Sequence, residues 1–565
     1  YSIIIYFKFT YKIYNNRIRK YMLFSLDLRT NILRSDLFMP RVLIAEKVCD
    51  QAQAVLKNKG IDVVYMPKIS RDELLAINGD YDGLIVRSQP VVDGELLEAA
   101  HKLKVVGRAG NGVDNIDMEC ATDRGIIVVN TPDANSVSAA ELTMGMIIAS
   151  SRHIPQANAS LKTGVWGRSR FQGSELRNKT VGIIGLGRIG SLVAQRLNAF
   201  EVKVIAYDPY ITDASFARVD AIKCETLADL LAEADLITIH TPKTEETINM
   251  ISDKELALAK DGVRIVNCAR GGLINEDTIL KGLKSGKIAS AACDVLTKEP
   301  CTEHPLYEEE NFIVTPHIGA TTDEAQLKVG LTIANEVAAA LTGDIVPNAV
   351  NMPLISKSDL TEIRPYLHLA ENLGKIYHQM EKTPVEKVEI VYCGDVAEME
   401  TEVLTLAVLK GVFEPILKER VNYVNARLTA EAREVAVAET REDLPNRYGS
   451  LIKVRIIAGG NIYQYAGTVF GRDEARIVEI AGYTFDFSPT ENMVVLCNYD
   501  APGLIGRIGL TMGDYYINIG TMQVSRKTAG GVAMMLMSVD SKVKKEYLES
   551  IAAIKGVTRV HGLEM

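Results

Sequence analysis

The chain has 565 residues, of which 47% are hydrophobic and 24% are charged, and its formal net charge is −9. This length is too great for one hydrophobic core, so about three or four domains are expected. The acidic balance argues against a nucleic-acid-binding protein, and no apolar run is long enough to span a membrane. The eight cysteines are scattered without metal-ligand spacing, which indicates a reducing compartment, expected to be the cytoplasm, and no metal.

Residues 1–38 differ from the rest of the chain because they are rich in Tyr, Ile and Phe and carry mostly basic charge. Two interpretations stay open for this segment. The favoured one is an extension without a role in the fold, with Met39 as the working start. The alternative is a segment that targets the protein to an organelle.

From residue 41 the hydrophobic pattern alternates between short β-rich runs and helical stretches, which is typical of a parallel sheet. Strands are expected at 42–45, 61–65, 83–86, 103–106 and 126–129, and helices at 49–58, 71–77 and 91–100. Loops beyond the carboxyl ends of parallel strands bind ligands. Arg87, Arg108 and the backbone of Gly110–Gly112 could therefore hold an anion. The alternative is a glycine turn with two solvated arginines.

A helix should then carry the chain out of this first α/β unit. Ser138 and Glu141 have the spacing of a capping box, and the apolar run 142–150 follows them, so a helix is predicted to begin there. A loop that contains Trp166, Arg168 and Arg170 comes next.

Residues 180–190 carry the strongest motif of the chain, a β-rich run that leads into Gly185-x-Gly187-x-x-Gly190 and a helix. This strand, turn and helix form the pyrophosphate grip of dinucleotide-binding folds. A second strand ends at Asp208, about 20 residues later, where a carboxylate would accept hydrogen bonds from a ribose and repel a 2′-phosphate. The spacing favours NAD over NADP as the cofactor. The alternative is a glycine turn in another kind of α/β unit.

Four further strands, at 235–240, 263–267, 290–293 and 312–314, should bring their end loops to one cleft. Three side chains of these loops have the chemistry of a hydroxy-acid oxidation. Arg270 offers a planar fork for a carboxylate, and His317 is a proton carrier near neutral pH. Glu299 could bond the far imidazole nitrogen and stabilise the imidazolium.

These motifs resemble those of the D-isomer-specific 2-hydroxyacid dehydrogenases, and most closely those of the long-form branch that acts on 3-phospho-D-glycerate. The similarity runs from about residue 40 to the end. Two departures are Asn111, where relatives often carry Thr, and Leu296, where Phe is usual. The motifs that carry the resemblance are Gly107-Arg-Ala-Gly-Asn-Gly-Val-Asp-Asn115, Asn130-Thr-Pro132, Gly185-Leu-Gly-Arg-Ile-Gly190, Asn267-Cys-Ala-Arg-Gly-Gly272, Asp294-Val295 with Glu299-Pro300, and Pro316-His-Ile-Gly-Ala320.

The resemblance implies that Arg270, Glu299 and His317 form the catalytic set. It also implies a set of contacts to the NAD cofactor, from Asn111, Gly185, Gly187, Arg188, Ile189, Gly190, Asp208, Thr241, Cys268, Ala269, Asp294, Gly319 and Ala320. The substrate is expected to be held by Arg87, Ser88, Arg108, Gly110, Asn111 and Arg168, of which Arg168, with Arg170, would reach across a dimer interface near Trp166.

The reaction that the resemblance implies is NAD-dependent oxidation of 3-phospho-D-glycerate to 3-phosphohydroxypyruvate, the first step of L-serine biosynthesis. His317 would be general base in this direction and general acid in reverse. The closest alternative is another member of the family that acts on glycerate, glyoxylate or a broader set of 2-oxoacids. An alternative from another class is a non-catalytic, NAD-sensing binding protein.

The last third of the chain is expected to hold two more domains. Residues 355–485 have a mixed α/β pattern and resemble the intervening, allosteric-substrate-binding type of domain, for which a structural role is favoured over anion binding. Residues 491–565 follow a βαββαβ order, the ferredoxin-like arrangement, and resemble an ACT regulatory domain. Regulation by L-serine through Asn498, Asp500 and Asn518 is weighed against a purely dimerising role.

The predicted fold class is α/β, with a Rossmann-type dinucleotide domain inserted in a flavodoxin-like substrate domain, then a mixed α/β domain and a ferredoxin-like domain. The protein is expected to be a homodimer or homotetramer that binds neither nucleic acid nor membrane. The predicted boundaries are 1–38 for the extension, 39–138 with 321–350 for the substrate domain, 139–320 for the Rossmann domain, 355–485 for the intervening domain and 491–565 for the ACT domain.

Overall fold

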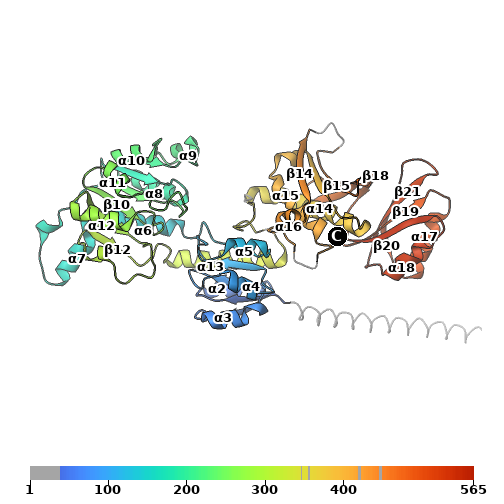
Figure 1. Ribbon diagram of the computed structural model, residues 1–565, viewed down its shortest axis with the longest axis horizontal. Coiled ribbons are helices and arrows are strands. Elements are labelled where there is room, and N and C mark those ends of the chain that lie inside the picture. Colours follow the sequence, from blue (N-terminus) through green and yellow to red (C-terminus); the bar gives the residue numbers. More distant parts are fainter. Residues whose placement is uncertain (1–38, 345, 354–356, 418–420, 444–447) are drawn as a thin grey trace, which may run out of the picture.

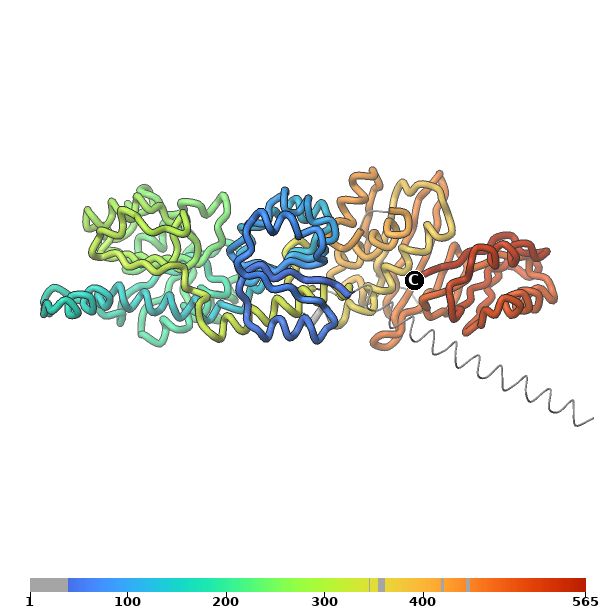
Figure 2. Tube along the Cα trace, turned by 90° about the horizontal axis from the view of Figure 1, so that it is seen from below, coloured from blue at the N-terminus to red at the C-terminus, as the bar shows by residue number. Residues whose placement is uncertain are grey.

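The computed structural model describes residues 39–344, 346–353, 357–417, 421–443 and 448–565. Residues 1–38 lie outside the described residues, so neither interpretation of that segment is tested. Four sheets build an elongated molecule in which the units lie roughly in a row (Figure 1, Figure 2). We refer to them as the first unit, the dinucleotide unit, the intervening unit and the C-terminal unit.

The first unit is a five-stranded parallel sheet in the order β2-β1-β3-β4-β5, which is the flavodoxin-like order predicted from the sequence. The central strand β3 is buried along its whole length because helices cover both faces. The elements are β1 (Arg41–Ile44), α2 (Asp50–Asn58), β2 (Asp62–Tyr65), α3 (Arg71–Ile77), η1 (Asn78–Asp80), β3 (Gly83–Val86), α4 (Gly94–Ala99), β4 (Val105–Arg108), α5 (Met118–Asp123) and β5 (Ile127–Val129).

The helix predicted at 91–100 is shorter than expected. It begins only at Gly94, because Asp93 caps it by accepting a hydrogen bond from Leu96 N at 3.1 Å. Val92 instead pairs with Ile116 in an isolated parallel bridge. The periodicity of the apolar residues continued across this boundary and so did not reveal it.

The dinucleotide unit is a seven-stranded parallel sheet in the order β12-β11-β10-β9-β6-β7-β8. Its strand order reverses at β6, as in the Rossmann fold, and the crevice at that point is where such sheets bind dinucleotides. The elements are α6 (Ser136–Arg152), α7 (Ile154–Lys162), η2 (Arg168–Phe171), β6 (Thr180–Ile184), α8 (Arg188–Asn198), β7 (Lys203–Tyr207), α9 (Asp213–Arg218), β8 (Ile222–Lys223), α10 (Leu227–Glu233), β9 (Leu236–Ile239), α11 (Asp253–Leu258), β10 (Val263–Asn267), α12 (Glu276–Ser285), β11 (Ile288–Cys293), η3 (Pro305–Glu308) and β12 (Phe312–Val314).

Two helices connect this unit with the first. Helix α6 leads out, and α13 (Asp323–Thr342) returns to pack on α2 and β4 through Val329, Ile333 and Val337. The capping box predicted at Ser138 is wrong. The helix starts earlier, with Asn135 at its N-cap, and the Ser138 hydroxyl lies 2.8 Å from Thr322 Oγ1 at the start of α13. Ser138 therefore joins the two connecting helices.

The intervening unit is a six-stranded sheet in the order β14-β13-β15-β16-β17-β18, with one parallel pair, β13 with β14. Its loop at 421–425 contacts the first unit, where the Asn422 amide donates to Gly125 O at 2.6 Å and Val424 enters the core. The elements are α14 (Lys357–Met380), β13 (Lys387–Gly394), η4 (Asp395–Glu398), α15 (Thr401–Phe413), α16 (Ala426–Ala432), β14 (Ala436–Glu442), β15 (Ser450–Ala458), β16 (Asn461–Phe470), β17 (Glu474–Ile480) and β18 (Tyr483–Phe487).

The C-terminal unit is an antiparallel sheet in the order β20-β21-β19-β22, the ferredoxin-like order predicted from the sequence. Its elements are β19 (Asn492–Tyr499), α17 (Leu504–Asp514), β20 (Ile519–Arg526), β21 (Val532–Val539), α18 (Lys545–Ala552) and β22 (Val557–Glu564).

The two faces of this sheet pack against different neighbours. The helices cover Val494, Leu496 and Met535, whereas Val495 and Leu536 belong to the same hydrophobic core as the intervening unit. The two C-terminal units thus share one core.

Two glutamine side chains join these units at their edges. The Gln379 amide bonds both the N–H and the carbonyl of Glu564, at 2.7 and 2.9 Å. In the opposite direction, Gln523 bonds the N–H and the carbonyl of Asp486, at 3.0 and 2.5 Å. Each amide thereby pairs with backbone groups that a strand edge would otherwise leave open.

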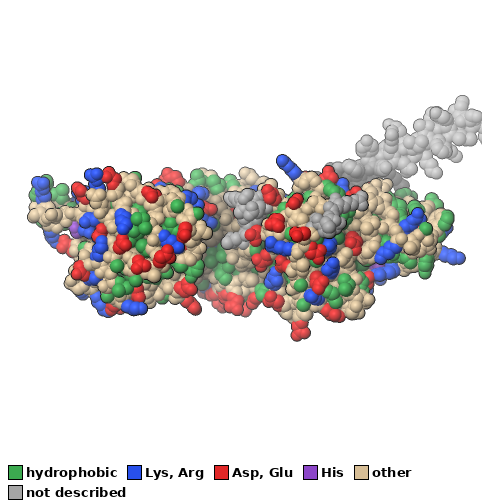
Figure 3. Space-filling view, turned by 90° about the horizontal axis from the view of Figure 1, so that it is seen from above, with side chains coloured by type: hydrophobic (Ala, Val, Ile, Leu, Met, Phe, Trp, Pro, Cys, Tyr) green, Lys and Arg blue, Asp and Glu red, His purple; other side chains and the backbone are tan. Residues whose placement is uncertain are grey.

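Acidic and basic side chains are interspersed over the face seen in Figure 3, without a patch of one sign. Within the part of the chain that the structure describes, no helix combines the length and the apolar composition that crossing a bilayer requires.

Candidate active site

The glycine turn after β6 has the geometry of a dinucleotide cradle. Gly185 has a φ of +87°, which a side chain would disfavour, and a Cβ at Gly190 would collide with Gly185 O. A Cβ at Gly187 would meet nothing within 4 Å, so the turn is open on the side where a pyrophosphate would approach. Helix α8 starts at Arg188 without a side-chain cap, and its first N–H groups stay available to an anion.

The Asp208 carboxylate lies beside this turn at the end of β7. It accepts a hydrogen bond from Leu186 N at 2.9 Å and another from Tyr210 N at 3.1 Å. These bonds fix the carboxylate at the rim of the cradle, in the position where the sequence places a ribose contact. Arg188, another predicted cofactor contact, forms an ion pair with Asp133 at 2.7 Å.

The remaining predicted cofactor residues lie at the carboxyl ends of the strands. Thr241 follows β9 and has a buried hydroxyl with no hydrogen-bond partner among the described residues. Cys268 follows β10 and is buried, which raises the pKa of its thiol to about 12. It is therefore a protonated packing residue. Ile189 packs on the core of the unit, Ala269 N donates to Asn267 Oδ1 at 3.0 Å, and Ala320 O accepts from Gln326 at 2.7 Å.

His317 and Glu299 form the hydrogen bond that the sequence predicted. His317 Nδ1 lies 2.6 Å from Glu299 Oε2, and Leu296 N donates to Glu299 Oε1 at 3.0 Å. Burial acts to raise the pKa of the Glu299 carboxyl, but the bonds from His317 and Leu296 outweigh it and hold the pKa below the ordinary value. Glu299 is thus a carboxylate at neutral pH, fixed at both oxygens.

Asp294 fixes the turn that presents His317. Its buried carboxylate accepts hydrogen bonds from Thr315 Oγ1 at 2.5 Å, from Ile318 N at 2.8 Å and from Gly319 N at 2.8 Å. His317 itself has a φ of +53°, in the left-handed region that a non-glycine residue rarely adopts. Because the surrounding bonds over-determine this backbone, the imidazole has one direction in which to point.

Arg270 is positioned by the loop between β10 and α12. Buried Asn267 holds this loop, since its amide donates to Arg270 O at 2.9 Å. The guanidinium then reaches toward the first unit, where Arg270 Nε lies 3.6 Å from Asp114 Oδ2. A Cβ at Gly112 would collide with this guanidinium, so the glycine leaves the room that Arg270 occupies.

Arg108 and Arg87 approach the same place from the first unit. Arg108 ends β4 and lies over Gly110, whose missing side chain leaves space for it. Burial, together with the charges of Arg270 and Arg87, lowers the pKa of Arg108 to about 10. Three guanidiniums from two units therefore face one region, and Arg108 Nε is buried without a hydrogen-bond partner among the described residues.

The other predicted substrate residues divide into two groups. Ser88 and Asn111 are exposed next to this region, and Asn111 O accepts a hydrogen bond from the Asn130 amide at 2.6 Å. Arg168 instead lies in η2, beyond the projecting helix α7, and its neighbour Arg170 pairs with Glu310 at 2.7 Å. The structure does not place Arg168 with the three arginines.

Sequence reasoning missed a second acid–histidine pair that supports the Glu299 loop. Glu276 Oε1 accepts from Thr297 N at 2.6 Å and from Thr297 Oγ1 at 2.8 Å, and Glu276 Oε2 lies 3.2 Å from His304 Nε2. Leu306 N donates to His304 Nδ1, which leaves the imidazole proton on the side of Glu276. Asn275 is a recognisable N-cap residue, so the sequence could have placed Glu276 at the start of α12. The partners of Glu276, Thr297 and His304, lie far away in the chain, and no local pattern indicates them.

Comparison with known proteins identifies the class. Residues 144–319 match the model of the D-isomer specific 2-hydroxyacid dehydrogenase NAD binding domain, and residues 362–481 match the D-3-phosphoglycerate dehydrogenase intervening domain. A D-3-phosphoglycerate dehydrogenase from Methanocaldococcus jannaschii is 42% identical over 92% of this chain and 99% of its own. One from Bacillus subtilis is 38% identical over 93% of this chain and 100% of its own.

Solved structures give the same answer for the first two units. The TT0316 protein from Thermus thermophilus is 31% identical, with a TM-score of 0.52, and covers 55% of this chain and 99% of its own. A glyoxylate reductase from Paecilomyes thermophila is 28% identical, with the same TM-score of 0.52, and covers 55% of this chain and 98% of its own.

The fold and the cleft thus define the class of NAD-binding D-isomer-specific 2-hydroxyacid dehydrogenases. Within this class, the chain belongs to the D-3-phosphoglycerate dehydrogenase family, whose intervening domain it carries.

Proposed function

We propose that the chain oxidises 3-phospho-D-glycerate to 3-phosphohydroxypyruvate with NAD, as the first step of L-serine biosynthesis. The observation that carries this proposal is the Glu299–His317 pair, with the Arg270 guanidinium close enough that its charge helps to lower the pKa of the Glu299 carboxyl. The names of relatives that match the chain over almost their full length support the substrate.

NAD fits the residues that are present, because the glycine turn is open at Gly187, α8 has an uncapped N-terminus and the Thr241 hydroxyl has no partner within the described part of the chain. The bound nicotinamide would accept the hydride from C2 of the substrate. Asp208 would hold the adenosine ribose, and Asp294, which is bonded to the His317 turn, has a remaining acceptor site for the nicotinamide end.

The chain's own residues would handle charge and protons. Arg270 orients the substrate carboxylate and the C2 oxygen through its planar fork. His317 Nε2 removes the C2 hydroxyl proton while Glu299 stabilises the imidazolium that forms. In the reverse direction, protonated His317 returns this proton to the carbonyl oxygen.

The substrate phosphate would lie against Arg87 and Arg108. Arg87→Ala should raise KM for 3-phospho-D-glycerate roughly ten- to a hundredfold, because a charge-assisted hydrogen bond is lost. It should change KM for an unphosphorylated 2-hydroxy acid far less. Steady-state kinetics on both substrates check this, with the exposed Arg124→Ala as a matched control. Equal effects on the two substrates would remove the phosphate role from Arg87.

A substrate panel tests the function as a whole. NADH absorbance is followed with 3-phospho-D-glycerate, D-glycerate, glyoxylate and 2-oxoglutarate, in the direction each requires, with NAD or NADP. The proposal expects the highest kcat/KM for 3-phospho-D-glycerate with NAD. A higher value for glycerate or glyoxylate favours the other family activities, and no turnover with any substrate favours an NAD-sensing binding protein.

We also propose that the enzyme is a homodimer or homotetramer, assembled through two surfaces. Helix α7 projects from the molecule (Figure 1). Its last turn exposes Leu161, and the segment that follows exposes Val165 and Trp166, of which Trp166 is 81% exposed. Monomeric proteins rarely expose such contiguous apolar groups. Docking of this arm on a second copy would bring Arg168 to the partner's cleft. Sedimentation of Trp166→Ala against the parent protein tests this interface.

L-Serine is proposed as an effector at the C-terminal unit. Asp500 accepts hydrogen bonds from Arg526 at 2.7 Å and Gly530 N at 3.1 Å, at one end of the sheet, whereas Asn518 donates to Asp540 at 2.8 Å at the other end. Asn498 is buried beside the first group, and its Oδ1 has no hydrogen-bond partner among the residues that the structure describes. One copy therefore does not bring Asp500 and Asn518 together.

Two copies paired along the edge strand β20 would bring them together, because antiparallel pairing reverses one end against the other. Apolar side chains of this unit are exposed on β20, at Val524, and on α17, at Ile505 and Leu510. Isothermal titration of the full-length protein with L-serine tests the effector. Absence of heat at millimolar serine would leave a purely dimerising unit. We place the enzyme in the cytoplasm, with its substrate.

A further inference from the structure

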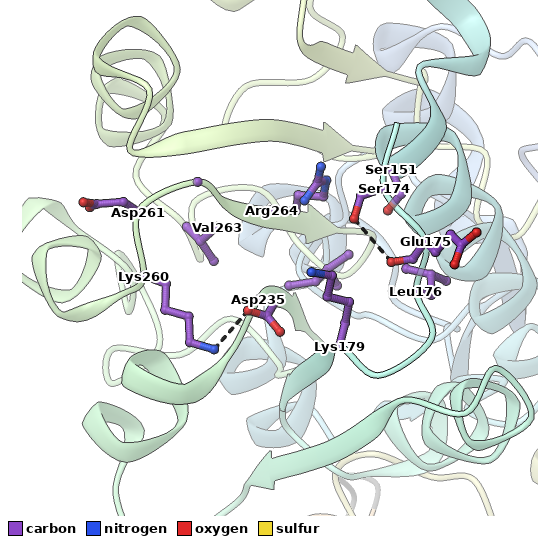
Figure 4. A pocket seen from close by; sticks show the side chains of 12 residues that line it. Ser151, Ser174, Glu175, Leu176, Lys179, Asp235, Lys260, Asp261, Val263 and Arg264 are labelled. Carbon is purple, nitrogen blue, oxygen red and sulfur yellow. Dashed lines mark hydrogen bonds and ion pairs between the residues drawn. The ribbon is translucent and has the colours of Figure 1, made fainter. Parts of the chain in front are cut away.

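A cavity of about 180 Å³ opens at the amino-terminal edge of the dinucleotide sheet, the edge opposite to His317 (Figure 4). It lies between the end of α6, the segment that leads into β6, and the starts of β9 and β10. None of the residues given a role in the reaction lines it. Its lining consists of Ser151, Ser174, Glu175, Leu176, Lys179, Asp235, Leu236, Lys260, Asp261, Gly262, Val263 and Arg264.

Two cations in this cavity have no bonded counter-charge among the described residues, and the Asp235 carboxylate acts on both of them only at longer range. Arg264, at the start of β10, is half-buried, and its Nε is buried without a hydrogen-bond partner among the described residues. Burial lowers the pKa of this guanidinium, which reflects the cost of keeping it charged there. The Lys179 ammonium group likewise forms no hydrogen bond or ion pair with any described residue, and only the backbone of this residue is bonded. Figure 4 shows both side chains reaching toward the hollow.

The neighbouring charges do not neutralise these two. Asp235 is bonded to Lys260 at 2.9 Å and to Thr180 N at 2.8 Å. Asp261 pairs with Lys287 at 2.9 Å, and Figure 4 shows its carboxylate directed away from the hollow, as is that of Glu175. The space therefore faces an excess of positive charge.

Neutral donors complete the lining. Ser151 is 2% exposed, and its buried hydroxyl has no hydrogen-bond partner among the described residues. Ser174 N donates to Ser151 O at 2.9 Å, whereas the Ser174 hydroxyl donates to Glu175 O at 3.3 Å. A guanidinium, an ammonium and the Ser151 hydroxyl form a site for an anion with several oxygens.

We propose that this cavity binds a small phosphate-class oxyanion, either free inorganic phosphate or the head group of a small phosphomonoester. The cavity holds about six water volumes, which suffices for such a group and excludes a nucleotide. Strand β10 carries Arg264 at its start and leads to Arg270 at its end, so the oxyanion site and the catalytic cleft lie at opposite edges of one sheet. Binding should stabilise the dinucleotide unit without taking part in the reaction.

The test measures the melting temperature of the full-length protein in rising inorganic phosphate at constant ionic strength, set with chloride. Saturating 3-phospho-D-glycerate without NAD is present throughout, so that the substrate-phosphate site at Arg87 and Arg108 is already occupied. At phosphate about tenfold above its dissociation constant, the temperature should rise by about 2 to 4 °C. Arg264→Met should lose this rise, and Ser151→Ala should reduce it. The control Arg177→Gln, which removes an exposed arginine paired with Glu201, should keep it.

Further measurements identify the anion and show whether the site is separate from the reaction. Glycerol 3-phosphate in place of inorganic phosphate shows whether a phosphomonoester also fits, which identifies the source of the anion. Arg264→Met should keep the kcat of the parent enzyme, since the site is remote from the reaction. A phosphate effect that persists in both Arg264→Met and Ser151→Ala, or is absent from the parent protein, would overturn the proposal. Should Arg264→Met not fold, Ser151→Ala alone decides the question.

Discussion

At the scale of single residues, the proposed reaction depends on a histidine whose direction is set by its backbone and by one carboxylate. The left-handed φ of His317 and the bonds of Asp294 fix the turn, and Glu299 fixes the ring through the 2.6 Å contact. Pre-organisation of this kind allows proton transfer without a search for the right geometry. Removal of the His317 ring or of the Glu299 carboxylate should therefore affect kcat more than KM.

His317→Ala should lower kcat by roughly 10²- to 10⁴-fold, the usual contribution of general acid–base catalysis. Glu299→Gln should cause a smaller loss and should move the acid limb of the pH–rate profile to lower pH, because the imidazolium loses its ionic partner. Steady-state measurements of kcat from pH 5 to 10 check both changes. Glu303→Gln, an exposed change on the same loop, is the control. An unshifted acid limb in Glu299→Gln would contradict the assigned role.

A second histidine should make stability depend on pH. Burial beside the glycine turn lowers the pKa of His240 from 6.5 to about 4. Between these values the unfolded chain binds a proton and the folded chain does not, so the free energy of unfolding should decrease as pH falls through this window, by roughly 2 to 3 kcal/mol. Urea unfolding at pH 7 and pH 4.5 checks this. The decrease should be smaller in His240→Gln and unchanged in the exposed control His101→Gln.

At the scale of elements, the catalytic loops are held by contacts between loops as well as by the strands that precede them. The loop of Arg270 and the loop of Glu299 touch where a Cβ at Gly271 would collide with Leu296 O. Glu276, on α12, then holds Thr297 and His304 from the opposite side. The geometry of Glu299 therefore depends on residues that never meet the substrate.

Glu276→Ala should lower kcat by up to about a hundredfold, because release of Thr297 lets the Glu299 loop move by a fraction of an ångström to an ångström. The KM for NAD should change little. Glu276→Gln should recover most of the rate, since its amide oxygen still accepts the two bonds from Thr297. Steady-state kinetics with Glu303→Ala as control check this, and a loss confined to KM would contradict a positioning role.

The sequence correctly predicted those features of the fold and the site that a local pattern of residues determines. The Gly185 turn, the strand ends that bear Arg270 and His317, and the order of the C-terminal unit all follow from spacing and periodicity. Prediction from the sequence failed where a residue's role depends on a partner far away in the chain. Ser138 bonds Thr322 instead of capping a helix. Asn267 and Glu276 position loops through contacts that no local pattern indicates. The helix start at Gly94 depended on a cap that apolar periodicity does not show.

At the scale of the whole molecule, the four units are not joined to the same degree. The first and dinucleotide units are connected by α6 and α13, and the intervening unit touches the first through the loop at Asn422. The intervening and C-terminal units share a continuous core and two glutamine bridges. We expect these last two units to respond to an effector as one body.

Gln379→Ala should destabilise the junction of these two units by about 1 to 2 kcal/mol, because two hydrogen bonds to Glu564 are lost. Denaturant unfolding of the full chain measures the change. Gln51→Ala, an exposed substitution on α2, is the control and should be neutral. If Gln379→Ala leaves the unfolding curve unchanged, the amide bridge contributes nothing to the junction.

The shared core also determines where the chain can be truncated. Ending the chain at about residue 490 would uncover the apolar face that Val495 and Leu536 now cover, so such a fragment should aggregate. A stop codon near residue 353, ahead of α14, removes both C-terminal units together and leaves that face out of the product altogether. The shorter fragment is therefore the better starting point for a soluble, minimal dehydrogenase.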